Sequence, residues 1–285
     1  MNVRRVLTTP EQQVTRSNAP GRPTVPGRKC RVRIIILALC GLTLISPIIS
    51  TPARAEEALI AVATNFAEIV RKLETRFEAA SQHELNIVTG STGKLFTQVT
   101  LGAPFDAFLA ADSVRPKRLE TEKFAVPGTR FTYAIGRLTL WSPDPQLLTS
   151  GGPATLRDGH FRHIAIANPD LAPYGLAARQ LMQHLGVEKQ LSGKIVMGEN
   201  AGQAFSMVAT GNAEMGFVPR SYVTSPKNVQ TGSHWHVPPK THDPIRQDAV
   251  LLNHGAKNSG AIEFLAFLRS AEARNVLKTF GYGVD

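Results

Sequence analysis

Short apolar runs alternate with helical patterns along most of the chain, and this alternation constrains the fold more than any other feature. Residues 59–64 have the composition of a buried strand, and residues 66–80 carry apolar side chains at helical spacing. Strands that alternate with helices are typical of a mainly parallel sheet flanked by helices. Further runs predict strands at 85–88, 106–110, 138–141, 163–167, 194–197, 215–218 and 249–252, and helices at 92–101, 175–185, 201–210, 259–269 and 271–279.

The alternation begins again after Arg137, which indicates two lobes. Between residues 221 and 243 the composition changes to Pro, Gly, Ser and His, which favours a loop where the chain crosses between lobes. We therefore predict an α/β protein in which residues 56–134 form the first part of lobe 1 and residues 135–218 form lobe 2. Residues 219–285 are expected to form the crossover and the second part of lobe 1. Two crossings make a hinge, and the cleft between the lobes is the expected ligand site.

Residues 1–55 have the features of a secretory signal peptide. A basic flank at 28–33 precedes an apolar run at 34–49, and the small-residue site Ala53-Arg54-Ala55 follows. The run contains Gly41 and Pro47 and falls short of the roughly 18–20 apolar residues that a membrane span needs. We therefore predict cleavage of this leader and export to the periplasm.

Without the leader, the charge and the cysteine content of the chain change. The leader holds nine of the 32 basic residues and one of the 22 acidic residues, so the rest carries a net charge of +2, against +10 for the whole chain. The basic character is therefore no argument for nucleic-acid binding. Cys30 and Cys40 also lie in the leader, which excludes a thiolate nucleophile or a Cys-based metal site in the exported part.

Four strand-to-helix junctions share a small, polar or Gly-rich character. Ligands of open α/β sheets bind beyond the carboxyl ends of the strands, where helix N-termini offer unpaired N–H donors. Side-chain hydroxyls of Thr64, Ser91 and Thr92 add neutral donors. One such junction alone is usually an ordinary helix cap, but four could hold a deprotonated tetrahedral anion without a cationic side chain. The junctions are residues 63–66, 90–93, 168–175 and 198–203.

Five segments resemble the periplasmic molybdate-binding proteins of ABC importers in their order and spacing, and the likeness covers about residues 58–285. The resemblance implies the two-lobed periplasmic binding protein fold of type II, in which two mainly parallel sheets close on an anion. It also implies a monomeric binding protein rather than an enzyme, with no cofactor, with molybdate or tungstate as ligand, and with importer membrane subunits as partners. The segments are AVATNF (61–66), GSTGKL (90–95), GAPFDAFLAAD (102–112), NPDLAPYG (168–175) and TGNAEMGFV (210–218).

The resemblance further implies which residues contact the oxyanion. Two hydroxyl positions of the family fall in the first two junctions, and two backbone N–H positions fall in the last two. The second hydroxyl is assigned by counting back from 102–104, so its neighbour is the alternative if the register is shifted. The candidates are Thr64 with Asn65 beside it, Thr92 or else Ser91, Tyr174 through its N–H, and Ala201 through its N–H.

One position departs from the family pattern. Some members place a tyrosine hydroxyl directly after the strand that corresponds to 215–218, and here that position is Pro219. Proline has no N–H and its side chain has no donor. The chain therefore either uses a variant of the site built on Thr64 and Asn65 or binds its ligand less tightly.

Two other functions stay open at this point. The chain could bind another anion, such as sulfate or phosphate, in the same kind of cleft. It could also be a secreted metal-dependent hydrolase that uses His234 and His236, with His242 nearby. Two histidines at i and i+2 without a fixed third ligand are a weak metal signal, so a solvated loop is the better interpretation of that segment.

Overall fold

The computed structural model describes residues 55–228 and 232–284, and Thr51–Asp285 form one compact unit. The predicted signal peptide, residues 1–55, lies outside the described residues except for Ala55. Within the described part of the chain, no helix has both the length and the apolar character needed to cross a membrane.

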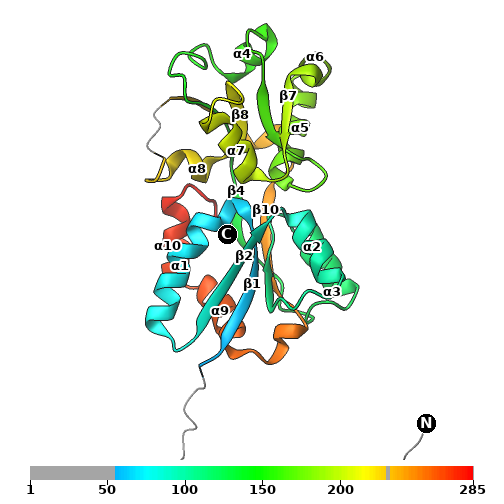
Figure 1. Cartoon of the computed structure of the whole chain (residues 1–285), viewed down its shortest axis with the longest axis vertical. Helices are drawn as coiled ribbons and strands as arrows, with labels where there is room; N and C mark the ends of the chain where they lie inside the picture. The colour runs from blue at the N-terminus through cyan, green and yellow to red at the C-terminus, as the bar shows by residue number, and fades with distance from the viewer. Residues whose placement is uncertain (1–54, 229–231, 285) are drawn as a thin grey trace, which may run out of the picture. The chain divides into compact units, whose positions relative to one another are not determined.

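Lobe 1 is built on a five-stranded sheet with the strand order β2-β1-β3-β10-β4. The strands β1, β2 and β3 are parallel, and β10 runs antiparallel to both of its neighbours. Figure 1 shows this sheet with helices packed along it. Its strands are β1 (Glu57–Ala63), β2 (Glu84–Gly90), β3 (Ala107–Leu109), β4 (Phe131–Gly136) and β10 (Ile245–Leu251).

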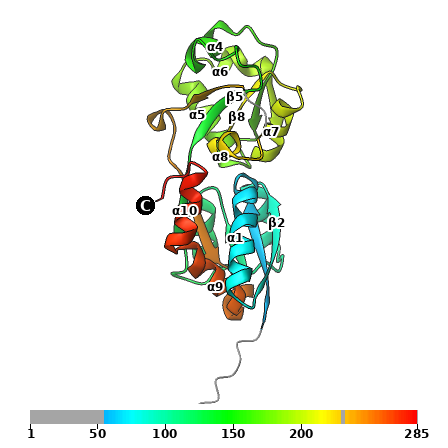
Figure 2. The ribbon, with the colours of Figure 1, turned by 90° about the vertical axis from the view of Figure 1, so that its left-hand side faces the viewer.

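Lobe 2 repeats the same plan with a second sheet in the order β7-β6-β8-β5-β9. Here β5 is the strand that runs antiparallel to its neighbours, while β6 is parallel to β7 and β8. The two sheets, seen from the side in Figure 2, confirm the two-lobed α/β fold, and both sheets are mixed because one strand in each runs antiparallel to its neighbours. The strands are β5 (Leu138–Ser142), β6 (Ile164–Ala167), β7 (Ile195–Gly198), β8 (Met215–Pro219) and β9 (Ser233–His236).

The helices cover the sheets with their apolar faces. In α1, for example, the buried residues Ile69, Val70, Leu73 and Phe77 recur at helical spacing. The helices of lobe 1 are η1 (Thr64–Phe66), α1 (Ala67–Ala80), α2 (Thr92–Thr100), α3 (Val114–Thr121), η4 (His254–Lys257), α9 (Ser259–Leu268) and α10 (Ala271–Thr279). Those of lobe 2 are α4 (Gly152–Asp158), α5 (Pro173–His184), α6 (Glu188–Leu191), η2 (Ser192–Lys194), α7 (Ala201–Ala209) and α8 (Arg220–Thr224), and η3 (Pro239–Thr241) lies on the return crossing.

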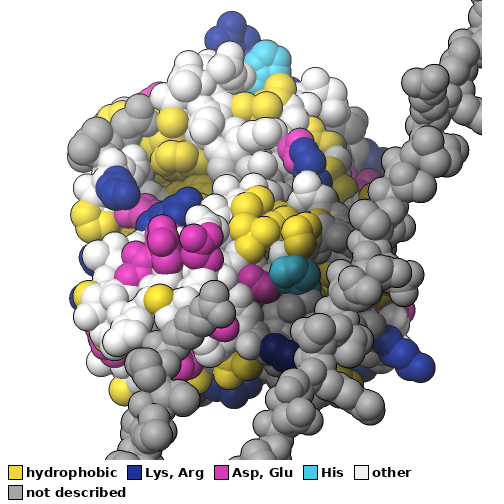
Figure 3. Space-filling model, turned by 60° about the horizontal axis from the view of Figure 1, so that its bottom comes forward, with side chains coloured by type: hydrophobic (Ala, Val, Ile, Leu, Met, Phe, Trp, Pro, Cys, Tyr) yellow, Lys and Arg dark blue, Asp and Glu magenta, His cyan; other side chains and the backbone are white. Residues whose placement is uncertain are grey.

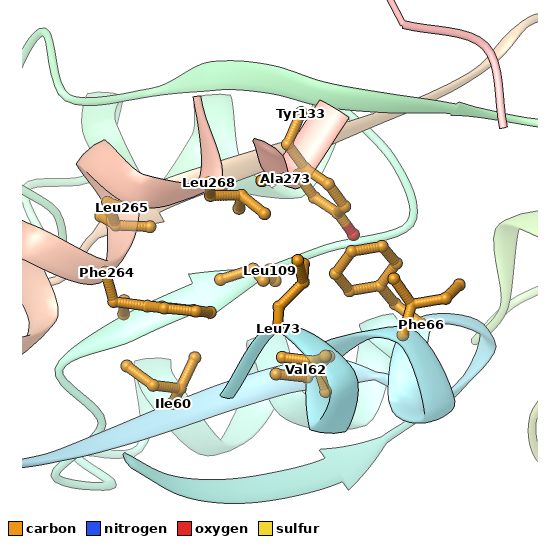
Figure 4. Packing of buried hydrophobic residues seen from close by; sticks show 14 of the residues in the cluster. Ile60, Val62, Phe66, Leu73, Leu109, Tyr133, Phe264, Leu265, Leu268 and Ala273 are labelled. Carbon is orange, nitrogen blue, oxygen red and sulfur yellow. The ribbon is translucent and has the colours of Figure 1, made fainter. Parts of the chain in front are cut away.

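The core of lobe 1 supports the turn that follows β1. Phe66 is fully buried, and its ring meets the ring of Tyr133 edge-on at a centroid distance of 4.9 Å. Figure 4 shows these two rings together, with Leu73 and Leu109 packed beside Phe66. The buried Phe66 ring therefore holds the 3-10 turn Thr64–Phe66 against the core of lobe 1, with the first residue of the turn at the edge of the sheet.

The second crossing between the lobes follows β9. The chain passes from β4 to β5 at Arg137, and β9 pairs with β5 and so belongs to lobe 2. The return to lobe 1 therefore falls between β9 and β10, at 237–244, inside the segment 219–285 that was expected to contain the crossover. The segment 221–243 is not all loop, since it contains most of α8 and the strand β9, where the backbone of SHWH at 233–236 pairs with β5 although its side chains are mostly polar.

Charged side chains of both signs occur on the surface. On the face seen in Figure 3, Lys and Arg side chains lie among Asp and Glu side chains and form no continuous basic surface. This agrees with the small net charge that remains when the leader is excluded.

Candidate functional site

The four predicted junctions meet at one small cavity between the lobes. Ala63 pairs with Gly90 at the carboxyl ends of β1 and β2, and Ala167 pairs with Gly198 at the carboxyl ends of β6 and β7. The cavity has an empty volume of about 190 Å³, and none of its twelve described lining residues is charged. It is lined by Ala63, Thr64, Asn65, Gly90, Ser91, Thr92, Ala111, Ala172, Pro173, Tyr174, Asn200 and Ala201, which include all six predicted site residues.

Two buried hydroxyl groups of lobe 1 can still donate a hydrogen bond. The Thr92 hydroxyl oxygen accepts a hydrogen bond from the Ala111 N–H at 3.1 Å, and the Ser91 oxygen caps α2 by accepting from the Lys94 N–H at 3.4 Å. In both bonds the hydroxyl is the acceptor, so its own O–H can still be donated. The Thr64 hydroxyl instead donates to the Gly90 carbonyl at 2.9 Å, and it would have to turn away from that carbonyl to reach a ligand.

Lobe 2 presents backbone N–H groups at the starts of two helices. Pro173 occupies the first turn of α5 and has no N–H, so Tyr174 carries the first amide of that helix. In α7 the Asn200 side chain caps the helix by accepting from the Gln203 N–H at 3.0 Å. That bond uses the Gln203 amide, which leaves the Ala201 amide at the helix start without an acceptor inside the helix.

The side chains of Asn65 and Tyr174 point away from a ligand and into a buried network behind the cavity. The Asn65 side-chain amide donates to Gln247 Oε1 at 2.9 Å and to the Tyr282 hydroxyl at 3.1 Å. Gln247 in turn donates to the Tyr174 hydroxyl at 3.1 Å. Burial raises the pKa of Tyr174 and of Tyr282, so both hydroxyls stay protonated. This network ties α5 of lobe 2 to β10 and to the 3-10 turn η1 of lobe 1.

The lobes also touch beside the cavity. The Gly93 N–H donates to the Leu171 carbonyl at 2.9 Å, which joins α2 directly to the loop before α5. Lys94 forms an ion pair with Glu199 across the lobes at 3.2 Å, and Arg115 forms one with Asp112. These two basic side chains are therefore neutralised by carboxylates and do not line the cavity.

Of the twelve described lining residues, only Ala111 lies outside the four predicted junctions. Ala111 follows β3, which is parallel to β1, so its place at the carboxyl edge of the sheet could have been found from strand order. His234 and His236 lie on β9 with ring centroids 4.6 Å apart. Among residues 55–228 and 232–284, no group of three or more His, Cys, Asp or Glu side chains could hold a metal ion.

A cavity between two α/β lobes, joined by crossing strands and lined by helix N-termini, defines a two-lobed ligand-binding protein. Residues 58–283 match the family described as bacterial extracellular solute-binding protein. The chain belongs to this family.

Similar proteins share most of their length with this chain. The molybdate-binding protein ModA of Rhodobacter capsulatus is 43% identical over 234 residues, which cover 82% of this chain and 91% of the relative. ModA of Azotobacter vinelandii is 42% identical over 238 residues, which cover 84% and 94%. The solved periplasmic molybdate-binding protein of Azotobacter vinelandii has a TM-score of 0.76 at 37% identity and covers 80% of this chain and 99% of its own. The family resemblance and the fold predicted from the sequence are thus confirmed.

Proposed function

We propose that this chain captures molybdate, or tungstate, in the periplasm and delivers it to the membrane subunits of an ABC importer. The observation that carries the proposal is the convergence of Thr92, Ser91, Tyr174 and Ala201 on one uncharged cavity. The relatives named as molybdate-binding proteins support the same ligand. We further propose that residues 1–55 direct export and are removed, and that the exported protein acts as a monomer without enzymatic activity.

The chemistry of the cavity suits a dianion that carries no proton. Hydroxyl and amide donors can point at its oxygens, while a carboxylate among the lining residues would repel it, and none of the described lining residues has one. Each hydrogen bond to a charged group contributes about 1.5–3 kcal/mol net. About six such bonds would exceed the roughly 8 kcal/mol of a micromolar affinity before the costs of ordering are subtracted.

The size of the cavity restricts the ligand. The cavity is small, with about 190 Å³ of empty space including open solvent. A small inorganic anion therefore fits better than an organic solute. Because the donors sit on the ends of helices and strands, a smaller tetrahedral anion would leave some of them unmatched. Molybdate and tungstate are nearly equal in size, and we expect the site to accept both.

Calorimetric titration tests the proposed ligand. Molybdate and tungstate should bind at a 1:1 ratio with micromolar or tighter affinity. Sulfate and phosphate should bind much more weakly and should fail to displace molybdate at equal concentration. Tighter binding of sulfate or phosphate would contradict the molybdate proposal and favour another anion as the substrate, and no binding of any of the four anions would contradict the site itself.

The Thr92→Ala variant is expected to bind molybdate about 10- to 100-fold more weakly, because it loses one hydroxyl donor to a charged ligand, worth about 1.5–3 kcal/mol. Thr97→Ala is the matched control, since the Thr97 hydroxyl donates to Gly93 O within the same helix and does not line the cavity. The dissociation constants of both variants can be measured by the same titration. If Thr92→Ala binds like the wild type, Ser91→Ala should be tested as the alternative donor, and normal binding by both would rule out a hydroxyl ligand at this junction.

A further inference from the structure

Helix α8 of lobe 2 reaches the first junction of lobe 1. The Tyr222 hydroxyl donates to the Thr64 carbonyl at 2.7 Å, although Tyr222 is not among the residues that line the cavity. The residue after α8 makes a second contact, because the Ser225 hydroxyl donates to the Glu68 carboxylate at 2.7–2.8 Å. Two neighbouring hydroxyls of lobe 2 thus contact the turn and the helix that follow β1.

The ring of Tyr222 packs against an aromatic pair of lobe 2. Phe205 of α7 meets it edge-on at 5.2 Å, and Phe205 is itself stacked on the buried Trp141 of β5 at 5.0 Å. These aromatic contacts fix the direction in which the hydroxyl points. The hydroxyl therefore extends toward lobe 1 from a ring that packs against lobe 2.

The start of α7 also lies unusually close to the side chain of Thr64. A Cβ atom at Gly202 would come within 2.7 Å of Thr64 Cγ2, nearer than side chains normally allow, and within 3.6 Å of the Tyr222 hydroxyl. Glycine at this position lets the start of α7, with the Ala201 amide, approach Thr64. Tyr222 lies directly beside this close approach, where a hydrogen bond can hold the lobes together.

We propose that Tyr222 is a positioning residue for anion capture, which holds the Thr64–Phe66 turn against lobe 2 in the closed protein without touching the anion. The proposal rests on the function proposed above. The Thr64 carbonyl has two lone pairs, and the Ala67 N–H occupies one of them. Donation from Tyr222 to the other satisfies this acceptor. When the lobes separate, water would bond to the Tyr222 hydroxyl and to the Thr64 carbonyl in place of this contact. Only the closed form therefore contains the direct hydrogen bond.

The hydroxyl of Tyr222 keeps its proton over the whole physiological range, because burial raises its pKa. It can only donate to the Thr64 carbonyl, which has no proton to give. The closing contact is therefore insensitive to pH near neutrality, and its removal should change affinity equally at pH 6 and pH 8.

The Tyr222→Phe variant tests this role, because it keeps the aromatic packing and removes the hydroxyl. We expect molybdate to bind about 3- to 10-fold more weakly and to dissociate faster by a similar factor, since only the closed form loses a hydrogen bond. The melting temperature of the anion-free protein should stay within about 1 °C of the wild type, because this contact is not needed to fold either lobe.

Thr210→Val is the matched control for this experiment. The Thr210 hydroxyl also donates to a carbonyl at 2.7 Å, but its partner, Ser206, lies in α7 of lobe 2, the helix that ends directly before Thr210. This variant should bind molybdate like the wild type. If Tyr222→Phe has a lower anion-free melting temperature but binds molybdate with wild-type affinity, the role of the hydroxyl is purely structural and the inference is overturned. Wild-type affinity together with a wild-type melting temperature would also overturn it. Failure of the wild type to bind molybdate would instead overturn the proposed function.

Discussion

Molybdate at 1 mM is expected to raise the melting temperature of this protein by about 8–16 °C. A ligand that binds only the folded state stabilises it by RT ln(1 + [L]/Kd), which is about 4.1 kcal/mol at a thousand times a micromolar Kd. For a protein of this size each kcal/mol corresponds to roughly 2–4 °C. The condition that only the folded state binds is met here, because the residues that line the cavity come from junctions far apart in the sequence, from Thr64 to Ala201.

Differential scanning calorimetry at several molybdate concentrations measures this shift. Sodium chloride at matched ionic strength is the first control, and sulfate is the second, because it is also a tetrahedral dianion. The shift should grow with the logarithm of the molybdate concentration and should be several degrees smaller in Thr92→Ala. A melting temperature that does not change with molybdate, or that rises as much with sulfate, would contradict the proposed ligand.

The convergence of the site could be predicted because it depends on local patterns. Each junction is a small polar segment between a strand run and a helix run, and parallel strands bring their carboxyl ends to one edge of a sheet. The order of elements therefore placed the junctions of Thr92 and Ala201 at one cleft, although 109 positions separate the two residues, and the family resemblance selected these residues within the junctions. The strands and helices that carry them have ordinary apolar spacing, so the patterns and the fold agree.

The parts that were missed depend on contacts between distant residues. Asn65 was expected beside the ligand, but its side chain binds Gln247 and Tyr282, which lie 182 and 217 positions further along the chain. No local pattern identifies such partners. The same holds for the first half of β10, which was not predicted as strand because Gln247 and Asp248 are polar, yet both are fully buried. Their burial is possible because each has hydrogen-bond partners that only the folded chain supplies.

The variant Arg130→Met is expected to lower the free energy of unfolding by about 3–5 kcal/mol, which corresponds to a fall of roughly 6–20 °C in melting temperature. The Arg130 guanidinium bonds the fully buried Asp248 carboxylate of β10 at 2.5 Å and also pairs with Glu120 at 2.9 Å. Methionine keeps much of the volume but removes the positive charge. Asp248 would then keep only neutral donors, such as the Thr132 hydroxyl at 2.7 Å, around a buried negative charge.

Two further variants separate the loss of charge pairing from a loss of packing. Arg118→Met removes an ion pair with Glu122 whose side chains are 54% and 40% exposed, and such surface pairs contribute only about 0–1 kcal/mol. In the double variant Arg130→Met with Asp248→Asn, the buried charge is gone as well, so most of the lost stability should return. Urea unfolding of the four proteins measures these differences. Removing the Asp248 charge can restore only the stability that was lost because this carboxylate had no partner. If the double variant is as unstable as Arg130→Met alone, the lost packing of the arginine side chain accounts for the effect, and not the unpaired Asp248 carboxylate.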